Sequence, residues 1–389
     1  MLDRHTLTAH LKAVNRPIEA ARGLPSALYT SEAALALERQ KIFFNGWACI
    51  GFGRDVPNCG DAKPVTFLGA PLLLLRDRDG VLRLFENTCR HRGMILVERA
   101  QNFGGVIRCP YHSWCYSTQG ALKATPHVGG PGINTHASIK PENTGLTPVR
   151  MGVFMDIVFA NISGTAESFE DFIAPLQARF SDFAQQSLYP ADDATDVNGG
   201  FALTISANWK LILENNVESY HLPWVHPGLN AYSRLEDHYH LIEPYSYSGQ
   251  GTLVYNPKLH ETLALPNFPN LPEKWNTGAE YASLFPNVFI SVHRDHYWAA
   301  MLDPLAHNQT CERVVMYYAS QEAAKGAGFA ALRAKNARLW KEVLTEDIMV
   351  TEGMQKGRGA PNFDGGIFSP VMDSPTHNFH KWVARRLGS

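Results

Sequence analysis

The sequence carries little net charge and no long hydrophobic run. Its 389 residues include 35 Lys and Arg against 37 Asp and Glu, which gives a formal net charge of −2. A chain without a surplus of basic residues lacks the positively charged surface that binds nucleic-acid phosphates, so we expect no nucleic-acid partner. Apolar stretches such as residues 71–75 are far shorter than the roughly 20 residues that span a bilayer, so we expect no membrane partner.

The sequence also contains few cysteines, and its first residues do not resemble a secretory signal. Residues 1–16 lack the apolar core of a signal peptide, which indicates a cytoplasmic protein. Thiols stay reduced in that compartment, so a spacing pattern among the six cysteines predicts metal binding rather than a disulfide. No Gly-x-Gly-x-x-Gly motif follows an expected strand, so we expect no dinucleotide site on this chain.

The hydrophobic patterns predict an α+β protein with two domains. Residues 31–44 have the spacing of an amphipathic helix with Ser31 as its N-cap. Short β-rich runs separated by turn residues follow at 65–68, 72–76, 81–86 and 106–108. They indicate a small antiparallel β domain. Later strand patterns fall at 202–205, 252–255, 288–292, 298–302 and 314–318, and helical patterns at 165–176, 214–222 and 330–355. We therefore expect an N-terminal helical segment (1–44) that packs on the C-terminal domain, a β domain (45–160) and an α+β domain (161–389).

Two pairs of metal-ligand residues lie within the expected β domain. Cys89 and His91 are separated by one residue, and Cys109 and His112 by two. Zinc fingers pair Cys with Cys and His with His, whereas each pair here contains one of each. Mixed pairs suit a Rieske [2Fe–2S] centre, in which two Cys bind one iron and two His bind the other.

A second set of candidate ligands lies in the C-terminal domain. His221 and His226 are five residues apart, and Glu218 precedes the first by three. A five-residue step on a regular helix would point the two rings apart, so we expect Pro223 to break the helix between them. Alone, this spacing is more typical of a structural histidine pair. Two His with one carboxylate, however, form the facial triad of non-haem Fe(II) oxygenases.

The first segment resembles the C-x-H-R-G and C-P-Y-H-x-W motifs of Rieske non-haem iron oxygenases, in their oxygenase α subunit. The second resembles the iron site of the same family, through its N-W-K, E-N and H-x4-H motifs. The matching residues are Asn208-Trp209-Lys210, Glu214-Asn215, His221 and His226, with Glu346-Asp347, Glu352 and Gln355 near the C-terminus. The resemblance implies an N-terminal antiparallel β Rieske domain and a C-terminal helix-grip-like α+β catalytic domain with an antiparallel sheet.

The resemblance also implies a role for each candidate residue. The [2Fe–2S] cluster is expected on Cys89, His91, Cys109 and His112, and the mononuclear Fe(II) on His221, His226 and Asp347. Glu346 and Asp295 compete with Asp347 for the ligand role. Glu218 is expected to conduct electrons between subunits of a homotrimer, from His112 of one chain to His221 of the next.

The implied reaction uses O₂ and electrons from NAD(P)H, delivered by a separate reductase or ferredoxin, to hydroxylate or oxidatively demethylate a small molecule. Aromatic-ring dioxygenases commonly carry Asp at the position of Glu218, with a segment one residue longer. The pattern E-N-x-x-E-x-Y-H here is more similar to oxygenases of quaternary ammonium compounds such as carnitine and glycine betaine. An aromatic-ring dioxygenase or an O-demethylase is the alternative. A Rieske electron-transfer protein is disfavoured because it needs only the first domain.

The remaining histidine pairs and most of the aromatic residues are expected to have structural roles. We expect structural roles for the pairs His238/His240, His293/His296 and His377/His380, since the two metal sites already have their ligands. Most aromatic residues near the iron ligands should be core. Some of them could instead cage a trimethylammonium group or line a slot for an aromatic ring. The candidates are Tyr220, Trp224, Tyr232, Tyr281, Phe285, Phe289, Tyr297 and Trp298.

Overall fold

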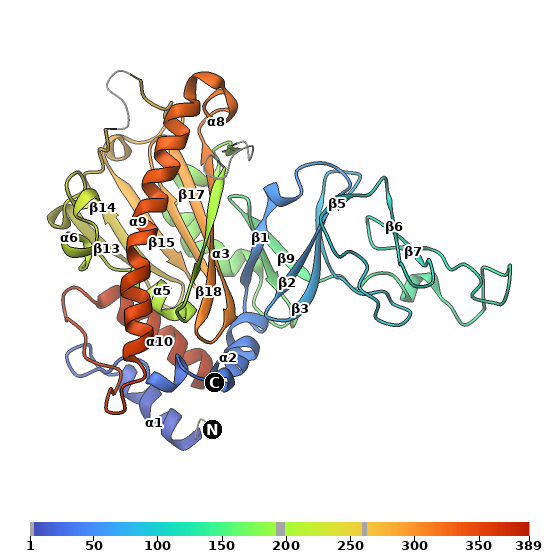
Figure 1. Cartoon of the computed structure of the whole chain (residues 1–389), viewed down its shortest axis with the longest axis horizontal. Helices are drawn as coiled ribbons and strands as arrows, with labels where there is room; N and C mark the ends of the chain where they lie inside the picture. Colours follow the sequence, from blue (N-terminus) through green and yellow to red (C-terminus); the bar gives the residue numbers. More distant parts are fainter. Residues whose placement is uncertain (1–3, 192–198, 259–262, 389) are drawn as a thin grey trace. The chain divides into compact units, whose positions relative to one another are not determined.

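A computed structural model describes residues 4–191, 199–258 and 263–388 of the chain (Figure 1). The chain forms two compact units. One consists of Met1–Ala48 together with Glu167–Ser389, and the other of Cys49–Ala166. None of the helices in the described ranges is both long enough and apolar enough to cross a membrane.

The unit Cys49–Ala166 consists of small antiparallel sheets, as the sequence predicts. One sheet has the order β4-β3-β2-β5, with β2 (Asp61–Phe67), β3 (Ala70–Arg76), β4 (Leu82–Glu86) and β5 (Gln101–Asn102). Another has the order β6-β7-β8, with β6 (Val106–Arg108), β7 (Cys115–Ser117) and β8 (Leu122–Ala124). The third has the order β1-β10-β9, with β1 (Ala48–Phe52), β9 (Arg150–Phe154) and β10 (Ile157–Asn161).

The other unit is built on an antiparallel sheet of the order β11-β18-β17-β16-β15-β14-β13, with β12 also paired to β18. Its strands are β11 (Tyr189–Pro190), β12 (Gly200–Ile205), β13 (His238–Glu243), β14 (Tyr247–Thr252), β15 (Ala279–Leu284), β16 (Val288–Val292), β17 (His296–Ala306) and β18 (Gln309–Tyr318). One row of paired residues crosses four strands: Gln250, Tyr281, Ser291 and Trp298. Side chains of directly paired residues share one face of a sheet, so this row faces one side.

Helices α5 (Trp209–Asn216) and α9 (Ala330–Gly357) pack against each other, and α9 runs along the sheet (Figure 1). α5 contacts β15 and β17, and α9 contacts β12. Arg179, the last residue of α3 (Phe169–Arg179), pairs with Glu280. Glu280 neighbours Tyr281 on β15 and therefore points to the opposite face of the sheet. α10 (Ser374–Gly388), which the sequence patterns did not reveal, packs on β13 and β14.

The remaining helices are short or lie near the N-terminus. They are α1 (Arg4–Val14), α2 (Glu32–Glu38), α4 (Ser181–Ala184), α6 (Leu222–Val225), α7 (Pro227–Asn230) and α8 (Gln321–Lys325). The predicted helix at 31–44 is confirmed as α2 and the π-helical turn η2 (Arg39–Phe44), and the Ser31 side chain caps it by accepting from the backbone N–H of Ala34.

Two predicted elements are wrong in their placement. The predicted strand at 252–255 ends at its first residue, because Thr252 Oγ1 bonds to both the N–H and the C=O of Val254 and turns the chain. The predicted helix at 214–222 begins earlier, where the Asn208 side chain caps α5, and ends at Asn216. Pro223 therefore does not break a helix. It lies in the first turn of α6, where a missing N–H costs no hydrogen bond.

Candidate active site

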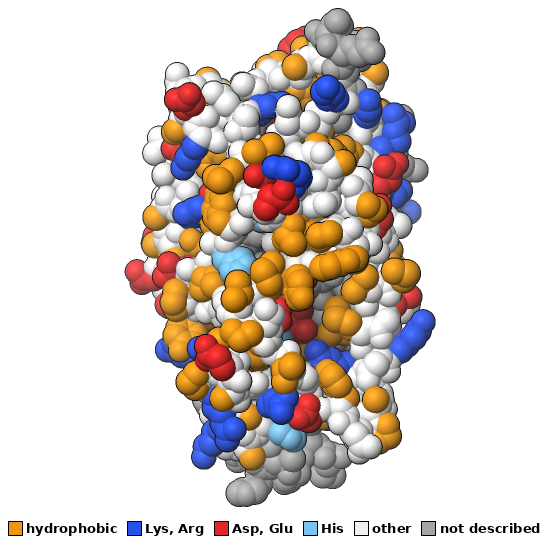
Figure 2. Space-filling view, turned by 90° about the vertical axis from the view of Figure 1, so that its left-hand side faces the viewer, with side chains coloured by type: hydrophobic (Ala, Val, Ile, Leu, Met, Phe, Trp, Pro, Cys, Tyr) orange, Lys and Arg blue, Asp and Glu red, His pale blue; other side chains and the backbone are white. Residues whose placement is uncertain are grey.

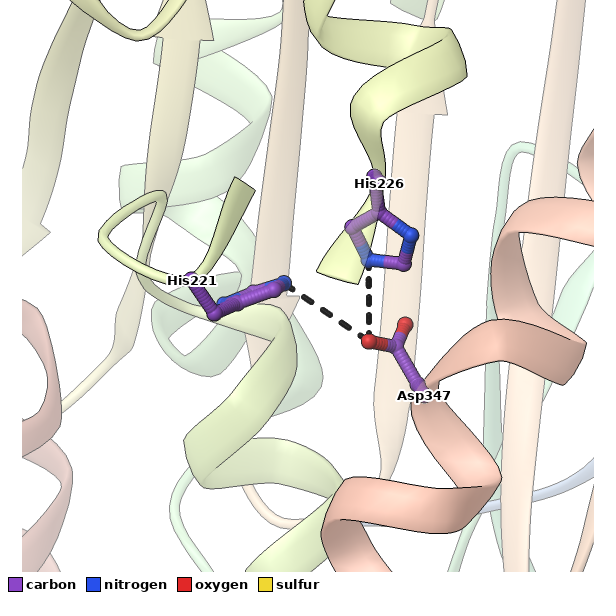
Figure 3. Close-up of side chains that lie close together, drawn as sticks. All are labelled: His221, His226 and Asp347. Carbon is purple, nitrogen blue, oxygen red and sulfur yellow. Dashed lines mark ion pairs between the residues drawn. The ribbon is translucent and has the colours of Figure 1, made fainter. Parts of the chain in front are cut away.

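His221, His226 and Asp347 converge on one point (Figure 3). One ligand atom from each lies within 4.8 Å of the others, and the described residues hold no second such group of three. Asp347 Oδ1 is 2.9 Å from Nε2 of His226 and 3.6 Å from Nε2 of His221. This oxygen is buried and accepts no hydrogen bond. Two imidazoles and an unpaired carboxylate oxygen are a donor set that fits a divalent transition metal such as Fe(II).

The local backbone brings the two histidines together. His221 precedes α6 and His226 follows it, so the two residues flank a single short helix. His226 has φ −121° and ψ 57°, outside the helical region, which lets α7 begin in a new direction. The ring centroids are consequently 5.1 Å apart, although a regular helix would point the rings away from each other.

Two further carboxylates hold the outer nitrogens of these rings. His221 Nδ1 is 2.6 Å from Glu218 Oε1, and His226 Nδ1 is 2.7 Å from Glu346 Oε2. When each Nδ1 donates to its carboxylate, Nε2 is left with a lone pair for a metal. Glu346 therefore supports the His226 ring and does not join the triad. Asp295, the other competitor, lies at His296, with Oδ1 2.6 Å from Nδ1 of that ring.

The carboxylates also set the electrostatics of the site. Burial lowers the pKa of His226, but the neighbouring carboxylates of Asp347 and Glu346 outweigh burial and the net pKa is raised. Glu312 on β18 is fully buried, and burial together with the charge of Asp347 raises its pKa to about 8. Glu312 is therefore mostly protonated at neutral pH and adds little negative charge. The carboxylates that face the two imidazoles are those of Asp347, Glu218 and Glu346, and their charge suits a cation.

A cavity of about 460 Å³, counted with the open space at its mouth, adjoins the triad. Its aromatic lining residues are Tyr281, Trp298 and Trp340, and the triad residues lie in the same lining. Of the aromatic candidates in the sequence, only Tyr281 and Trp298 line this cavity. Trp340 was not among them, although it lies two turns before Asp347 on α9, a seven-residue spacing that places both on one helix face.

Several other predicted aromatics lie elsewhere. Tyr220 and Trp224, close to His221 and His226 in sequence, are exposed by 44% and 72%. Phe285 and Tyr297 are core residues. Exposed hydrophobic side chains gather on the face of the molecule shown in Figure 2, on the side where α6 lies.

The motif residues around Asn208 tie α5 to α9 and to the N-terminal segment. Lys210 and Glu38 are fully buried and pair at 2.6 Å. Glu352 Oε1 and Gln355 Oε1 on α9 accept from the backbone N–H groups of Ser206 and Asn208. These contacts fix how α9, which carries Asp347, sits against the segment that carries both histidines. The motif residues outside the triad are therefore mainly a framework for the site.

The four candidate cluster ligands lie on two loops of the same design. The N–H of Cys89 donates to the C=O of Met94, and the N–H of Gly93 donates back to Cys89. Cys109 makes the equivalent pair of bonds with Trp114 and Ser113. Gly93 and Ser113 occupy the same loop position, and both have positive φ, 72° and 57°. Only Gly adopts this backbone region without strain, which explains the glycine of the first motif.

The ligand side chains of the two loops face one another. The His91 and His112 rings are 4.6 Å apart, and His91 stacks on Trp114 at 4.9 Å. Cys89 and Cys109 are 3% and 1% exposed. Burial raises the pKa of the Cys89 thiol, while the hydrogen bond from the Tyr116 hydroxyl, 3.3 Å from Sγ, favours its thiolate. Both sulfurs are buried, whereas His91 is exposed and His112 is half-buried. This arrangement fits a cluster with one Cys₂ and one His₂ iron.

The three histidine pairs assigned structural roles make hydrogen bonds outside the triad. His238 Nδ1 is 2.6 Å from Gln250 Oε1, and His238 itself lines the cavity. His293 Nε2 is 2.6 Å from the Ser291 hydroxyl. His377 Nε2 donates to a backbone carbonyl, and His380 pairs with Glu214 at 3.0 Å.

Two family models match the sequence. One describes the Rieske [2Fe–2S] domain and matches residues 46–137, and the other describes the catalytic domain of the ring-hydroxylating alpha subunit and matches residues 191–389. Choline monooxygenase of Atriplex hortensis is 25% identical over 95% of this chain and 79% of its own length. The carnitine monooxygenase oxygenase subunit of Escherichia coli is 25% identical over 88% of this chain and 86% of its own.

Solved structures share the fold over nearly the whole chain. A quaternary ammonium Rieske monooxygenase superposes with a TM-score of 0.78 at 21% identity, covering 97% of this chain and 98% of the other. Naphthalene 1,2-dioxygenase from a Rhodococcus species superposes with a TM-score of 0.75 at 19% identity, covering 100% and 99%. Both reaction classes therefore occur on this fold, and the fold alone does not select a substrate.

Proposed function

The chain belongs to the family of ring-hydroxylating alpha subunits, and we propose that it is a monooxygenase of a small quaternary ammonium compound. Members of this family are oxygenase components that carry a Rieske [2Fe–2S] cluster and a mononuclear iron. The cavity beside the triad carries the proposal. Tyr281, Trp298 and Trp340 can surround a trimethylammonium group with aromatic faces, which attract cations. The curated relatives that act on choline and carnitine, each 25% identical, support the same substrate class.

The proposed ligands follow from the two donor sets. His221, His226 and Asp347 hold the mononuclear iron, and Cys89, His91, Cys109 and His112 hold the cluster. When both groups are bound, the iron activates O₂ and the cluster supplies electrons received from a separate NAD(P)H-dependent reductase or a ferredoxin. Glu218 and Glu346 keep the two histidines in the tautomer that presents Nε2 to the metal.

We assign Glu218 as the bridge for electrons that arrive from a neighbouring chain of a homotrimer. Its carboxylate holds His221 and also accepts from the backbone N–H groups of Tyr220 and His221. Tyr220 and Trp224 are exposed and lie close to it in the chain, just before and within α6. The side of the molecule where α6 lies is rich in hydrophobic side chains (Figure 2). Such a surface suits contact with another subunit. The protein is proposed to act in the cytoplasm, with domains at 1–44, 45–160 and 161–389.

Wild-type protein, supplied with a generic reductase and NADH, tests the function. We expect about three iron atoms per chain, two in the cluster and one in the triad. We expect turnover of at least one of choline, carnitine and glycine betaine, with one product formed per O₂ consumed. Turnover of naphthalene or of a methoxybenzoate, without turnover of any quaternary amine, would replace this proposal by the aromatic alternative. An iron content of two would indicate an electron carrier.

Cys89→Ser is expected to abolish the visible absorption of the cluster, because the variant loses a thiolate ligand to one iron. Iron binding at His221 and His226 should persist, since those ligands belong to the other compact unit. Cys115→Ser is the matched control. Cys115 is also buried, but its thiol hydrogen-bonds to the carbonyl of Ser113 and it lies outside the ligand spacing. A normal cluster spectrum in Cys89→Ser, or its loss in Cys115→Ser, would refute the ligand assignment.

A further inference from the structure

Buried hydrogen-bond donors without partners gather at the aromatic wall of the cavity. Tyr281 and Trp298 both line the cavity and are 7% and 1% exposed. The hydroxyl of Tyr281 and the indole N–H of Trp298 make no hydrogen bond within the described part of the chain. Buried polar groups in proteins are nearly always paired. Two unpaired donors on one cavity wall therefore indicate a partner that the protein itself does not supply.

The neighbouring acceptors on the sheet are already occupied. Gln250, paired with Tyr281 on one side, accepts from His238 Nδ1 and donates to the carbonyl of Glu218. Ser291, paired with Tyr281 on the other side and also with Trp298, bonds to His293 Nε2. Neither flanking side chain bonds to either of the two unpaired donors.

The third aromatic side chain of the wall is fixed by its own hydrogen bonds. Trp340 Nε1 donates to His296 Nε2 at 3.0 Å, and His296 Nδ1 donates to Asp295 at 2.6 Å. These two hydrogen bonds use the accepting nitrogen of His296, so the His296 ring cannot also accept from Trp298. The ring centroids of Trp298 and Trp340 are 5.3 Å apart. The same hydrogen bonds also hold the Trp340 ring in place beside the two unpaired donors. A molecule in the cavity can supply the acceptor that these two donors lack among the described residues.

The charge of the lining restricts what this acceptor can be. No Lys or Arg is present among the described residues that line the cavity, and the only carboxylate there is Asp347. A substrate carboxylate at this wall would lose its hydration without gaining a Lys or Arg partner, which is unfavourable in a buried site. An uncharged oxygen accepts from a hydroxyl and an indole N–H without that cost. The aromatic faces meanwhile suit the ammonium group.

We propose that Tyr281 and Trp298 form a subsite for an uncharged acceptor oxygen on the substrate, such as a hydroxyl. The inference rests on the proposed function and makes it narrower. Among quaternary ammonium compounds, the enzyme then favours an alcohol over a carboxylate.

Kinetics of the holoenzyme with its reductase test the subsite, with choline, glycine betaine and tetramethylammonium as probes. Wild-type protein is expected to show a kcat/KM for choline at least about tenfold above that for glycine betaine, the effect of one buried hydrogen bond or more. Tyr281→Phe removes one donor and keeps the ring. It should lower the ratio of kcat/KM for choline to that for tetramethylammonium about tenfold, mainly through KM. Trp298→Phe should shift this ratio in the same direction.

Tyr255→Phe is the matched control. Tyr255 is also buried with an unpaired hydroxyl, and its ring stacks on Trp340, but it does not line the cavity. Removal of the Tyr255 hydroxyl should leave the ratio of kcat/KM for choline to that for tetramethylammonium unchanged. Equal use of choline and glycine betaine, or the same ratio in Tyr281→Phe and Tyr255→Phe, would overturn the subsite while the proposed function stands. If no quaternary ammonium compound binds or is turned over, the proposed function and the subsite fall together.

Discussion

Asp347→Asn is expected to lose the mononuclear iron, while the cluster keeps its visible absorption and turnover falls below detection. The Asp347 oxygen that faces both histidines is buried and has no hydrogen bond, so a metal is its natural partner. A neutral amide oxygen is a much weaker ligand for Fe(II) than a carboxylate. Iron analysis of the purified protein should therefore drop from about three to about two atoms per chain.

Glu346→Gln is the matched control for this substitution, because it makes the same carboxylate-to-amide change one residue away. Glu346 holds Nδ1 of His226 and is 43% exposed. Removing such an outer partner weakens metal binding by roughly 10- to 100-fold, so iron should be retained when Fe(II) is in excess. If Glu346→Gln lost the iron and Asp347→Asn kept it, the ligand assignment between these two neighbours would be reversed.

The parts of the molecule that follow local rules could be predicted from the sequence. Three such features depend only on residues close in the chain: the Ser31 cap, the helix α9 and the β-rich runs around Cys89. The family resemblance predicts a Rieske domain followed by a catalytic domain, and the two family models match the chain in that order. The motif residues Glu352 and Gln355 lie 146 and 147 residues from the backbone groups that they bind, and no local pattern reveals that pairing.

The parts that were missed depend on tertiary contacts. Pro223 was expected to break a helix, but α5 already ends at Asn216, before the loop in which the Glu218 carboxylate bonds to backbone N–H groups. The sequence predicts Glu346 only as a rival ligand, since nothing in the sequence shows that it faces the outer nitrogen of His226. Trp340 was overlooked because its role depends on β17, where His296 accepts its N–H.

Glu218→Gln is expected to lower turnover by at least about 100-fold while both metals stay bound. The amide keeps the size of the side chain and one acceptor oxygen, so His221 should stay near its position. It removes the negative charge that polarises the imidazole and, in our proposal, conducts electrons toward it. The cluster should still be reduced by dithionite, because its ligands belong to the other compact unit.

The decisive measurement is a single turnover. The cluster is reduced beforehand, and the rate of its reoxidation is followed after substrate and O₂ are added. Glu346→Gln again provides the comparison, since it alters the outer partner of the other histidine at almost the same distance, 2.7 Å against 2.6 Å. If Glu218 only orients a ligand, the two variants should reoxidise the cluster at similar rates once iron is saturating. If it is the bridge, reoxidation slows in Glu218→Gln alone. A wild-type rate in Glu218→Gln would refute the bridge, and loss of iron from that variant would make Glu218 itself a ligand.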